Sequence, residues 1–115
     1  SDSYIVQHAS FSFIKPLLQR GVNVYFYQKG FIHSKTISID SKLAFVGTVN
    51  LDTRSFYLNF EITSLIHEHA LCKACEHSFF IDRQESQLVT IEQWQKRPIL
   101  HRGLDSVCRL LAALL

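Results

Sequence analysis

The sequence predicts an α/β fold, because segments with the two-residue period of strands are interleaved with segments of helical period. Residues 22–27 alternate as a strand does, whereas residues 70–80 have the spacing of a helix. Hydrophobic residues make up 47% of the 115-residue chain, which is enough for one compact core. We therefore expect a single domain over residues 1–115, built from a mixed β-sheet flanked by helices.

A helix is expected first, capped by Asp2 or Ser3. Pro16 lies inside this helical pattern and has no backbone donor, so a kink, or a second helix start near residues 10–12, is expected. Gly21 is typical of a helix end.

The expected strands alternate in polarity or are rich in β-branched residues, and they cover residues 22–27, 31–39, 43–46 and 58–66. Residues 40–42, Asp-Ser-Lys, are typical of a turn, and residues 47–56 are expected to form a polar loop. Glu61 falls inside the last of these strands.

Two further helices are expected near the C-terminus. Thr90 is a candidate cap for the first, and Arg97-Pro98 should end it. Residues 104–115 form an amphipathic pattern, in which apolar residues recur at helical spacing: Leu104, Val107, Leu111 and Leu114. This pattern favours a core face over a membrane anchor.

Composition narrows the possible functions and settings. The formal net charge of +2 is too small to indicate nucleic-acid binding, which needs many phosphate contacts. No apolar run reaches the roughly 20 residues that cross a bilayer. Three cysteines without a secretory pattern indicate a reducing compartment. The chain begins at Ser1 and has no methionine, so we expect part of a longer polypeptide.

The segment from His33 to Glu61 carries the chemistry. His33 and Lys35 are two residues apart on an expected strand, so their side chains should leave the same face. Two potential cations there repel, and a bound phosphate would resolve the repulsion. Thr48 and Asn50 can donate hydrogen bonds to phosphate oxygens. Glu61 could bond the second ring nitrogen of His33 and fix its tautomer.

These residues resemble the HKD signature of the phospholipase D superfamily. The match consists of His33, Lys35 and Asp40 at their spacing, followed by Gly47-Thr48-Val49-Asn50. The strings GFIHSKT, VGTVNLDTRSFYLNFEI and WQKRP further resemble bacterial cardiolipin synthases. The resemblance covers nearly the whole chain, which carries one HKD motif where that family has two, and none of the family's N-terminal membrane helices.

The resemblance implies a phospholipase D-like layered domain and specific residue roles. It implies that His33, Lys35, Asp40 and Glu61 form the catalytic set and that Lys35, Thr48 and Asn50 bind the substrate phosphate. For Asp40, holding the turn is the favoured interpretation. No metal and no other cofactor is implied.

The implied reaction is phosphatidyl transfer through a phosphohistidine, forming cardiolipin from two phosphatidylglycerol molecules with release of glycerol. The implied partners are phosphatidylglycerol or another phospholipid, a membrane surface, and a second HKD half from the same polypeptide or another copy, with no nucleic acid. The implied location is the bacterial inner membrane, reached through segments outside this chain, with the catalytic domain facing the cytoplasm.

Alternative interpretations remain open. The chain could be a single-motif phosphodiesterase or nuclease that works as a homodimer, or an inactive fragment that binds anionic lipid. The stretch HEHALCKACEH offers zinc-ligand residue types, yet its Cys72 and Cys75 fit the apolar face of a helix better. Asp52 and Arg54 could pair with each other, shape the loop, or, for Arg54, approach the phosphate.

Overall fold

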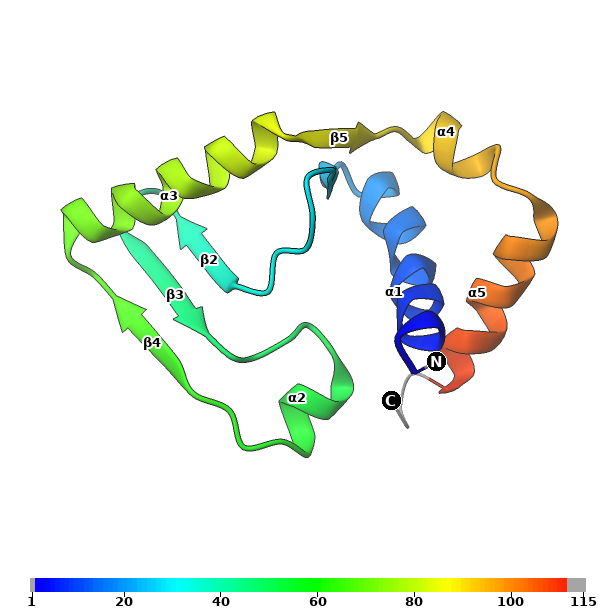
Figure 1. Cartoon of the computed structure of the whole chain (residues 1–115), viewed down its shortest axis with the longest axis horizontal. Coiled ribbons are helices and arrows are strands. Elements are labelled where there is room, and N and C mark those ends of the chain that lie inside the picture. Colours follow the sequence, from blue (N-terminus) through cyan, green and yellow to red (C-terminus); the bar gives the residue numbers. More distant parts are fainter. Residues whose placement is uncertain (1, 112–115) are drawn as a thin grey trace. The chain divides into compact units, whose positions relative to one another are not determined.

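The computed structural model describes residues 2–111 and contains both helices and sheets, which confirms the α/β class (Figure 1). The helices are α1 (Asp2–Gln19), α2 (Thr53–Tyr57), α3 (His69–Gln84), α4 (Ile91–Gln95) and α5 (Ile99–Leu111). The strands are β1 (Val24–Tyr27), β2 (Lys35–Ile39), β3 (Leu43–Gly47), β4 (Thr63–Ile66) and β5 (Ser86–Val89). Strand β1 pairs with β5, and β2, β3 and β4 form a second sheet.

The chain divides into two compact units. The first combines Ser1–Phe26 with Leu88–Leu115, and the second is Tyr27–Gln87. The expectation of one domain over residues 1–115 stays a prediction, and each unit is described by itself. None of the helices among residues 2–111 is long and apolar enough to span a membrane.

In the first unit α1 is one continuous helix that includes Pro16, so no second helix start divides it. Only three residues follow Pro16 within the helix, so the missing backbone donor falls near its end. The helix stops as expected at Gly21, whose φ is 79°. The amide of Gly21 donates to the Leu18 carbonyl over 3.1 Å and that of Val22 to the Leu17 carbonyl over 3.1 Å, which is a Schellman end.

Aromatic rings and one guanidinium fill the space beside α1. Phe11 lies 5.8 Å from Phe26 and 5.6 Å from Trp94 between ring centroids. The Arg97 guanidinium carbon lies 4.1 Å from the Trp94 centroid and 5.0 Å from that of Phe11. Trp94 lies on α4, which Thr90 begins with a capping box, as expected.

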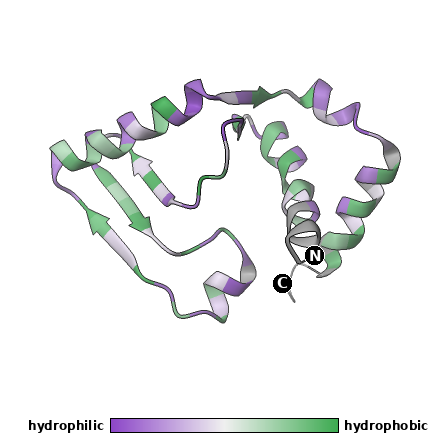
Figure 2. Ribbon diagram, viewed as in Figure 1, coloured by the Kyte–Doolittle hydropathy of each residue, from purple (hydrophilic) through white to green (hydrophobic). Residues whose placement is uncertain are grey.

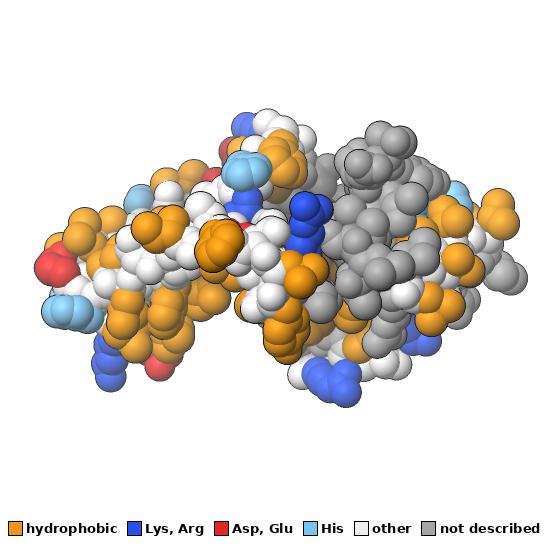
Figure 3. Space-filling view, turned by 90° about the horizontal axis from the view of Figure 1, so that it is seen from below, with side chains coloured by type: hydrophobic (Ala, Val, Ile, Leu, Met, Phe, Trp, Pro, Cys, Tyr) orange, Lys and Arg blue, Asp and Glu red, His pale blue; other side chains and the backbone are white. Residues whose placement is uncertain are grey.

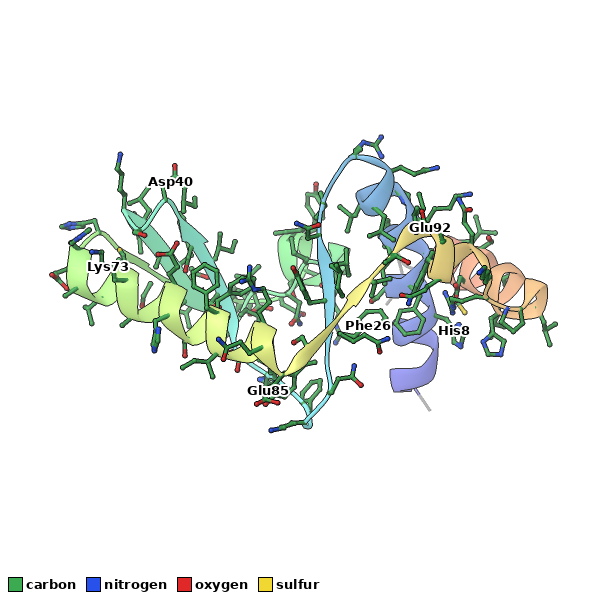
Figure 4. The ribbon with its side chains drawn as sticks, turned by 90° about the horizontal axis from the view of Figure 1, so that it is seen from above. His8, Phe26, Asp40, Lys73, Glu85 and Glu92 are labelled. Atoms are coloured by element: carbon green, nitrogen blue, oxygen red, sulfur yellow. The ribbon has the colours of Figure 1, made fainter. Side chains whose placement is uncertain are left out.

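A buried polar cluster connects α1 to α5, and His8 is labelled in Figure 4. Asp105 and His8 are 5% and 4% exposed. The His8 Nδ1 atom lies 2.6 Å from Asp105 Oδ1, and Arg97 donates from Nη1 to Asp105 Oδ2 over 2.8 Å. Both carboxylate oxygens therefore have partners, as a buried charge requires.

The face that α5 turns to α1 differs from the expected one. Asp105 and Cys108 are buried, whereas Val107 is 58% exposed. Leu104 is half-buried, and the Leu111 side chain and Leu114 lie outside the described residues. The spacing of apolar residues did not predict this face, because the buried position 105 holds a charged residue. The carboxylate of Asp105 is buried there with two partners, His8 and Arg97.

In the second unit β2, β3 and β4 form an antiparallel sheet. Its register pairs Lys35 with Gly47 and Gly47 with Thr63, and it pairs Ile37 with Phe45 and Phe45 with Leu65. Strand β3 is hydrophobic from Leu43 to Val46 (Figure 2). Such a central strand is paired along both of its edges.

The β2–β3 connection turns as expected at Asp40, which lies at the tip of the hairpin (Figure 4). Asp40 and Ser41 have φ of 51° and 52°, and the Lys42 amide donates to the Ile39 carbonyl over 2.9 Å. Asp is among the residues that tolerate this left-handed conformation. The Ser41 hydroxyl donates to Glu76 on α3.

Helix α3 packs against β2 and β3. Ala44 and Cys72 are fully buried, and the Cys72 Sγ donates to the Ile66 carbonyl over 3.4 Å. The alternate positions of the strands carry apolar side chains on the opposite face, namely Ile37, Ile39, Leu43, Phe45 and Leu65. Hydrophobic side chains accordingly lie at the surface of this unit (Figure 3).

We expect Gly47→Ala to destabilise the protein by about 1–3 kcal/mol, the usual cost of overpacking. A Cβ at Gly47 would lie 2.5 Å from the Ile62 carbonyl oxygen and 2.7 Å from Thr63 Cα, so backbone would have to move. Gly103→Ala is the control, because Gly103 has open space on a helix and alanine should stabilise it by about 1 kcal/mol. Urea unfolding measures both changes, and equal stability of the two variants would contradict the clash.

Candidate active site

The candidate residues gather at one end of the three-stranded sheet. Lys35 begins β2, Gly47 ends β3 and Thr63 begins β4, and the three are paired across the sheet. In an antiparallel sheet these positions share one end, so the three flanking loops meet there. Those loops carry His33, Thr48, Asn50 and Glu61.

His33 lies in the loop before β2, and not on a strand as expected. It is nevertheless beside Lys35, because the lysine turns back on its own loop. Lys35 Nζ donates to the His33 carbonyl over 2.6 Å and lies 3.2 Å from His33 Nδ1 and 3.3 Å from Nε2. The imidazole is exposed and the lysine is partly buried, so the ring is open to a ligand next to a fixed cation.

Thr48 and Glu61 join the β3 and β4 ends of the site. The Thr48 hydroxyl donates to Glu61 Oε2 and accepts from the Ile62 amide over 3.0 Å. The Thr48 amide donates to the Ile62 carbonyl over 2.9 Å, which extends the β3–β4 pairing by one residue. Glu61 itself precedes β4, so the expected strand begins later than residue 58.

The carboxylate of Glu61 accepts from Thr48 on one oxygen and from Asn59 Nδ2 on the other, over 3.3 Å. The Thr48 hydrogen bond is the main reason that the pKa of Glu61 is lowered, and Ser55, Asn59 and the charge of Lys35 lower it further. The expected bond from Glu61 to His33 is not made in this structure. Its role in setting the histidine tautomer stays a prediction.

Asn50 and Asp40 occupy different places. Asn50 is exposed in the loop between β3 and α2, at the site end of the sheet. Asp40 lies at the other end of β2, five residues from Lys35, or about 16 Å at the rise of a strand. The geometry supports the turn role that was favoured for Asp40, and a catalytic role for it remains a prediction.

Helix α2 occupies part of the expected polar loop. Asp52 caps it, accepting from the Ser55 amide over 2.6 Å, so Asp52 shapes the loop and does not pair with Arg54. Arg54 Nε instead donates to Asn59 Oδ1 over 3.3 Å. Asn59 and Ser55 were not singled out from the sequence, although Asp52 is itself a residue type preferred as a helix cap.

The histidine- and cysteine-rich stretch forms the start of α3. Glu68 caps the helix by accepting from the amides of Ala70 and Leu71 over 3.0 and 2.8 Å, and these bonds lower the pKa of Glu68. Within residues 2–111 no three His, Cys, Asp or Glu side chains are grouped to hold a metal ion. Cys72 packs against the sheet, as the apolar-face interpretation expects.

We expect Thr48→Val to raise the pKa of Glu61, because valine removes its principal hydrogen-bond donor. Bonds to an ionised carboxylate stabilise the fold above its unfolded pKa and are lost as pH falls through the lower folded pKa. The variant should therefore lose less stability on acidification than the parent. Carbon-13 NMR titration of Glu61 measures the shift, and Thr48→Ser, which keeps the hydroxyl, should restore the parent pKa. Identical titrations in the valine and serine variants would contradict this assignment.

A histidine lies beside a lysine, and a hydroxyl and a carboxylate are joined at the same sheet end, as the HKD signature of a phospholipase D-like domain predicts. The family model for the cardiolipin synthase, PLD-like domain matches residues 1–83. The chain therefore belongs to the cardiolipin synthase group of phospholipase D-like proteins.

Curated relatives agree with this membership. A cardiolipin synthase of Halalkalibacterium halodurans is 41% identical over 114 residues, covering 99% of this chain and 23% of the relative. One of Clostridium perfringens strain SM101 is 44% identical over 104 residues, covering 90% and 22%. One of Geobacillus kaustophilus is 42% identical over 114 residues, covering 99% and 23%.

The chain spans less than a quarter of the length of these relatives. No solved structure matches it.

Proposed function

We propose that the chain carries one half of a phosphatidyl-transfer site with His33 at its centre. The observation that supports this most is the approach of Lys35 Nζ to within 3.2 Å of the His33 ring. Two groups that can each be cationic gain from an anion between or beside them, and a phosphodiester is such an anion. The relatives, named cardiolipin synthases, make a phospholipid the natural source of it.

The chemistry divides between two histidines. One imidazole nitrogen attacks phosphorus, a phosphorus–nitrogen bond forms, and the bond to the leaving glycerol oxygen breaks. The other imidazole gives that oxygen its proton. A hydroxyl of a second lipid then attacks phosphorus, loses its proton to the second imidazole, and releases the first histidine. His33 supplies one of these two groups.

The remaining residues stabilise the charge on the phosphoryl oxygens. Lys35 offers a full positive charge, and Thr48 and Asn50 offer neutral donors. The Thr48 hydroxyl has one proton, which it now gives to Glu61, so binding phosphate through it requires the hydroxyl to turn. Glu61 would then have an oxygen free to accept from His33, which reconciles the two proposed roles of this carboxylate.

The second histidine must come from a second HKD half, either elsewhere in the same polypeptide or in another copy. We propose phosphatidylglycerol as donor and acceptor, with cardiolipin and glycerol as products, at the bacterial inner membrane. The choice of this lipid rests on the names of the relatives. The site residues by themselves would suit any phosphodiester.

The test is an assay on vesicles of phosphatidylglycerol with a radiolabelled headgroup. It compares the 115-residue chain with the longest natural polypeptide that contains this chain. Release of labelled glycerol together with cardiolipin supports the proposal. Cleavage of a water-soluble phosphodiester by a symmetric dimer, without lipid product, would favour the homodimeric phosphodiesterase. Vesicle binding without turnover in either preparation would favour the inactive lipid-binding fragment.

A further inference from the structure

We propose that Asn59 is a positioning residue of the candidate site, oriented by Arg54 so that its amide donates to the carboxylate of Glu61. The sequence did not single out Asn59, and it offered Arg54 only as a residue that could approach the phosphate. Only the expected effect of Asn59 on turnover rests on the proposed function; its effect on the pKa of Glu61 does not.

The direction of the Asn59 amide follows from the chemistry of its two neighbours. Arg54 can only donate, so the group it meets at 3.3 Å must be the Asn59 oxygen. An ionised Glu61 can only accept, so the group it meets at 3.3 Å must be the Asn59 nitrogen. A single asparagine orientation satisfies both ends, and the reversed amide would place donor against donor and acceptor against acceptor.

The backbone keeps the three side chains together. The amides of Leu58 and Asn59 both donate to the Arg54 carbonyl over 2.9 Å, where α2 ends. Backbone hydrogen bonds, as well as the side-chain hydrogen bond, therefore hold Asn59 close to Arg54. Glu61 follows two residues later, before β4 begins.

The importance of the Asn59 amide as a donor depends on which other groups surround the carboxylate of Glu61. Thr48, Ser55 and Asn59 face the carboxylate, and Lys35 is the charged group that acts on it. The hydroxyl of Ser55 is buried and makes no hydrogen bond in the present geometry, although it lies close enough to Glu61 to lower the pKa of that carboxyl as well. If Thr48 turns toward a phosphate, Asn59 becomes the donor that still holds Glu61. It would keep Oε1 occupied and leave Oε2 for His33.

The test measures the pKa of Glu61 in the 115-residue chain by carbon-13 NMR, without reference to activity. Asn59→Ala removes the donor and should raise the pKa of Glu61. Asn59→Asp keeps the shape but places a second carboxylate beside Glu61, and should raise the pKa further. Arg54→Met should raise it as well, because the asparagine loses the partner that orients it. Asn23→Asp, an exposed change outside this network, is the control for added negative charge and should leave the titration unchanged.

A Glu61 titration that is the same in the parent, Asn59→Ala and Asn59→Asp would overturn the inference. The three test variants, Asn59→Ala, Asn59→Asp and Arg54→Met, change exposed side chains. Circular dichroism checks that each of them keeps the parent fold. In a preparation active on phosphatidylglycerol, the acidic limb of the pH profile should move upward in Asn59→Asp. A uniform loss of activity at every pH would show a merely structural role. Absence of lipid turnover in the parent would count against the proposed function and leave the titration result standing.

Discussion

Replacement of His33 by asparagine should abolish phosphatidyl transfer while leaving the fold unchanged. Among the residues that meet at the site end of the sheet, imidazole is the group able to attack phosphorus or move a proton near neutral pH. Loss of a general acid or base alone costs about 10²–10⁴ in rate, and loss of the nucleophile removes the covalent route. The expected decrease is therefore at least about 10²-fold in a preparation active on phosphatidylglycerol.

The His33 side chain is exposed, so its replacement should not affect stability. Equal thermal unfolding of parent and variant is the control, since it separates lost chemistry from lost structure. Replacement of the exposed His67, which lies outside the site, should leave turnover at the parent level. A His33→Asn variant that retained turnover within a few-fold of the parent would rule out a catalytic role for His33.

Replacement of Asp105 by alanine should have the largest effect on stability, a loss of about 3–5 kcal/mol, as is usual when one member of a buried ionic group is removed. The change takes the carboxylate from His8 and from Arg97 at once. Arg97 would retain its stacking on Trp94, but its charge would stay largely buried without the counter-charge. Urea unfolding measures the loss.

Asp105→Asn is the matched variant, because it keeps the shape and one acceptor oxygen while it removes the charge. Its stability should fall between those of the parent and the alanine variant. A loss below about 1 kcal/mol in Asp105→Ala would mean that the cluster contributes no more than an exposed ion pair does.

The sequence predicted best those features that depend on neighbouring residues. The cap at Thr90, the end of α1 at Gly21 and the turn at Asp40 each follow from one backbone requirement that a short motif satisfies, and each was confirmed. The resemblance of the HKD residues to the phospholipase D superfamily was likewise confirmed at the level of the family.

Features that depend on distant partners were harder to predict. Alternation made residues 31–34 look like part of a strand, but the sheet register begins only at Lys35. The burial of Asp105 depends on His8, 97 residues earlier, and no local pattern reports such a pairing. Asn59 gained its role only when the end of α2 placed it between Arg54 and Glu61.

The hairpin turn at Asp40 has a consequence for the opposite end of the sheet. Lys35 and Asp40 are separated by the length of β2. The number of residues between them in the motif therefore sets how far Lys35 lies from the turn. Strand side chains alternate between faces, and a slip of one residue would carry Lys35 to the wrong side of the sheet. Asp40, which accepts a left-handed conformation, fixes where the count begins. We therefore expect Asp40, about 16 Å along the strand from Lys35, to influence which face of the sheet Lys35 occupies.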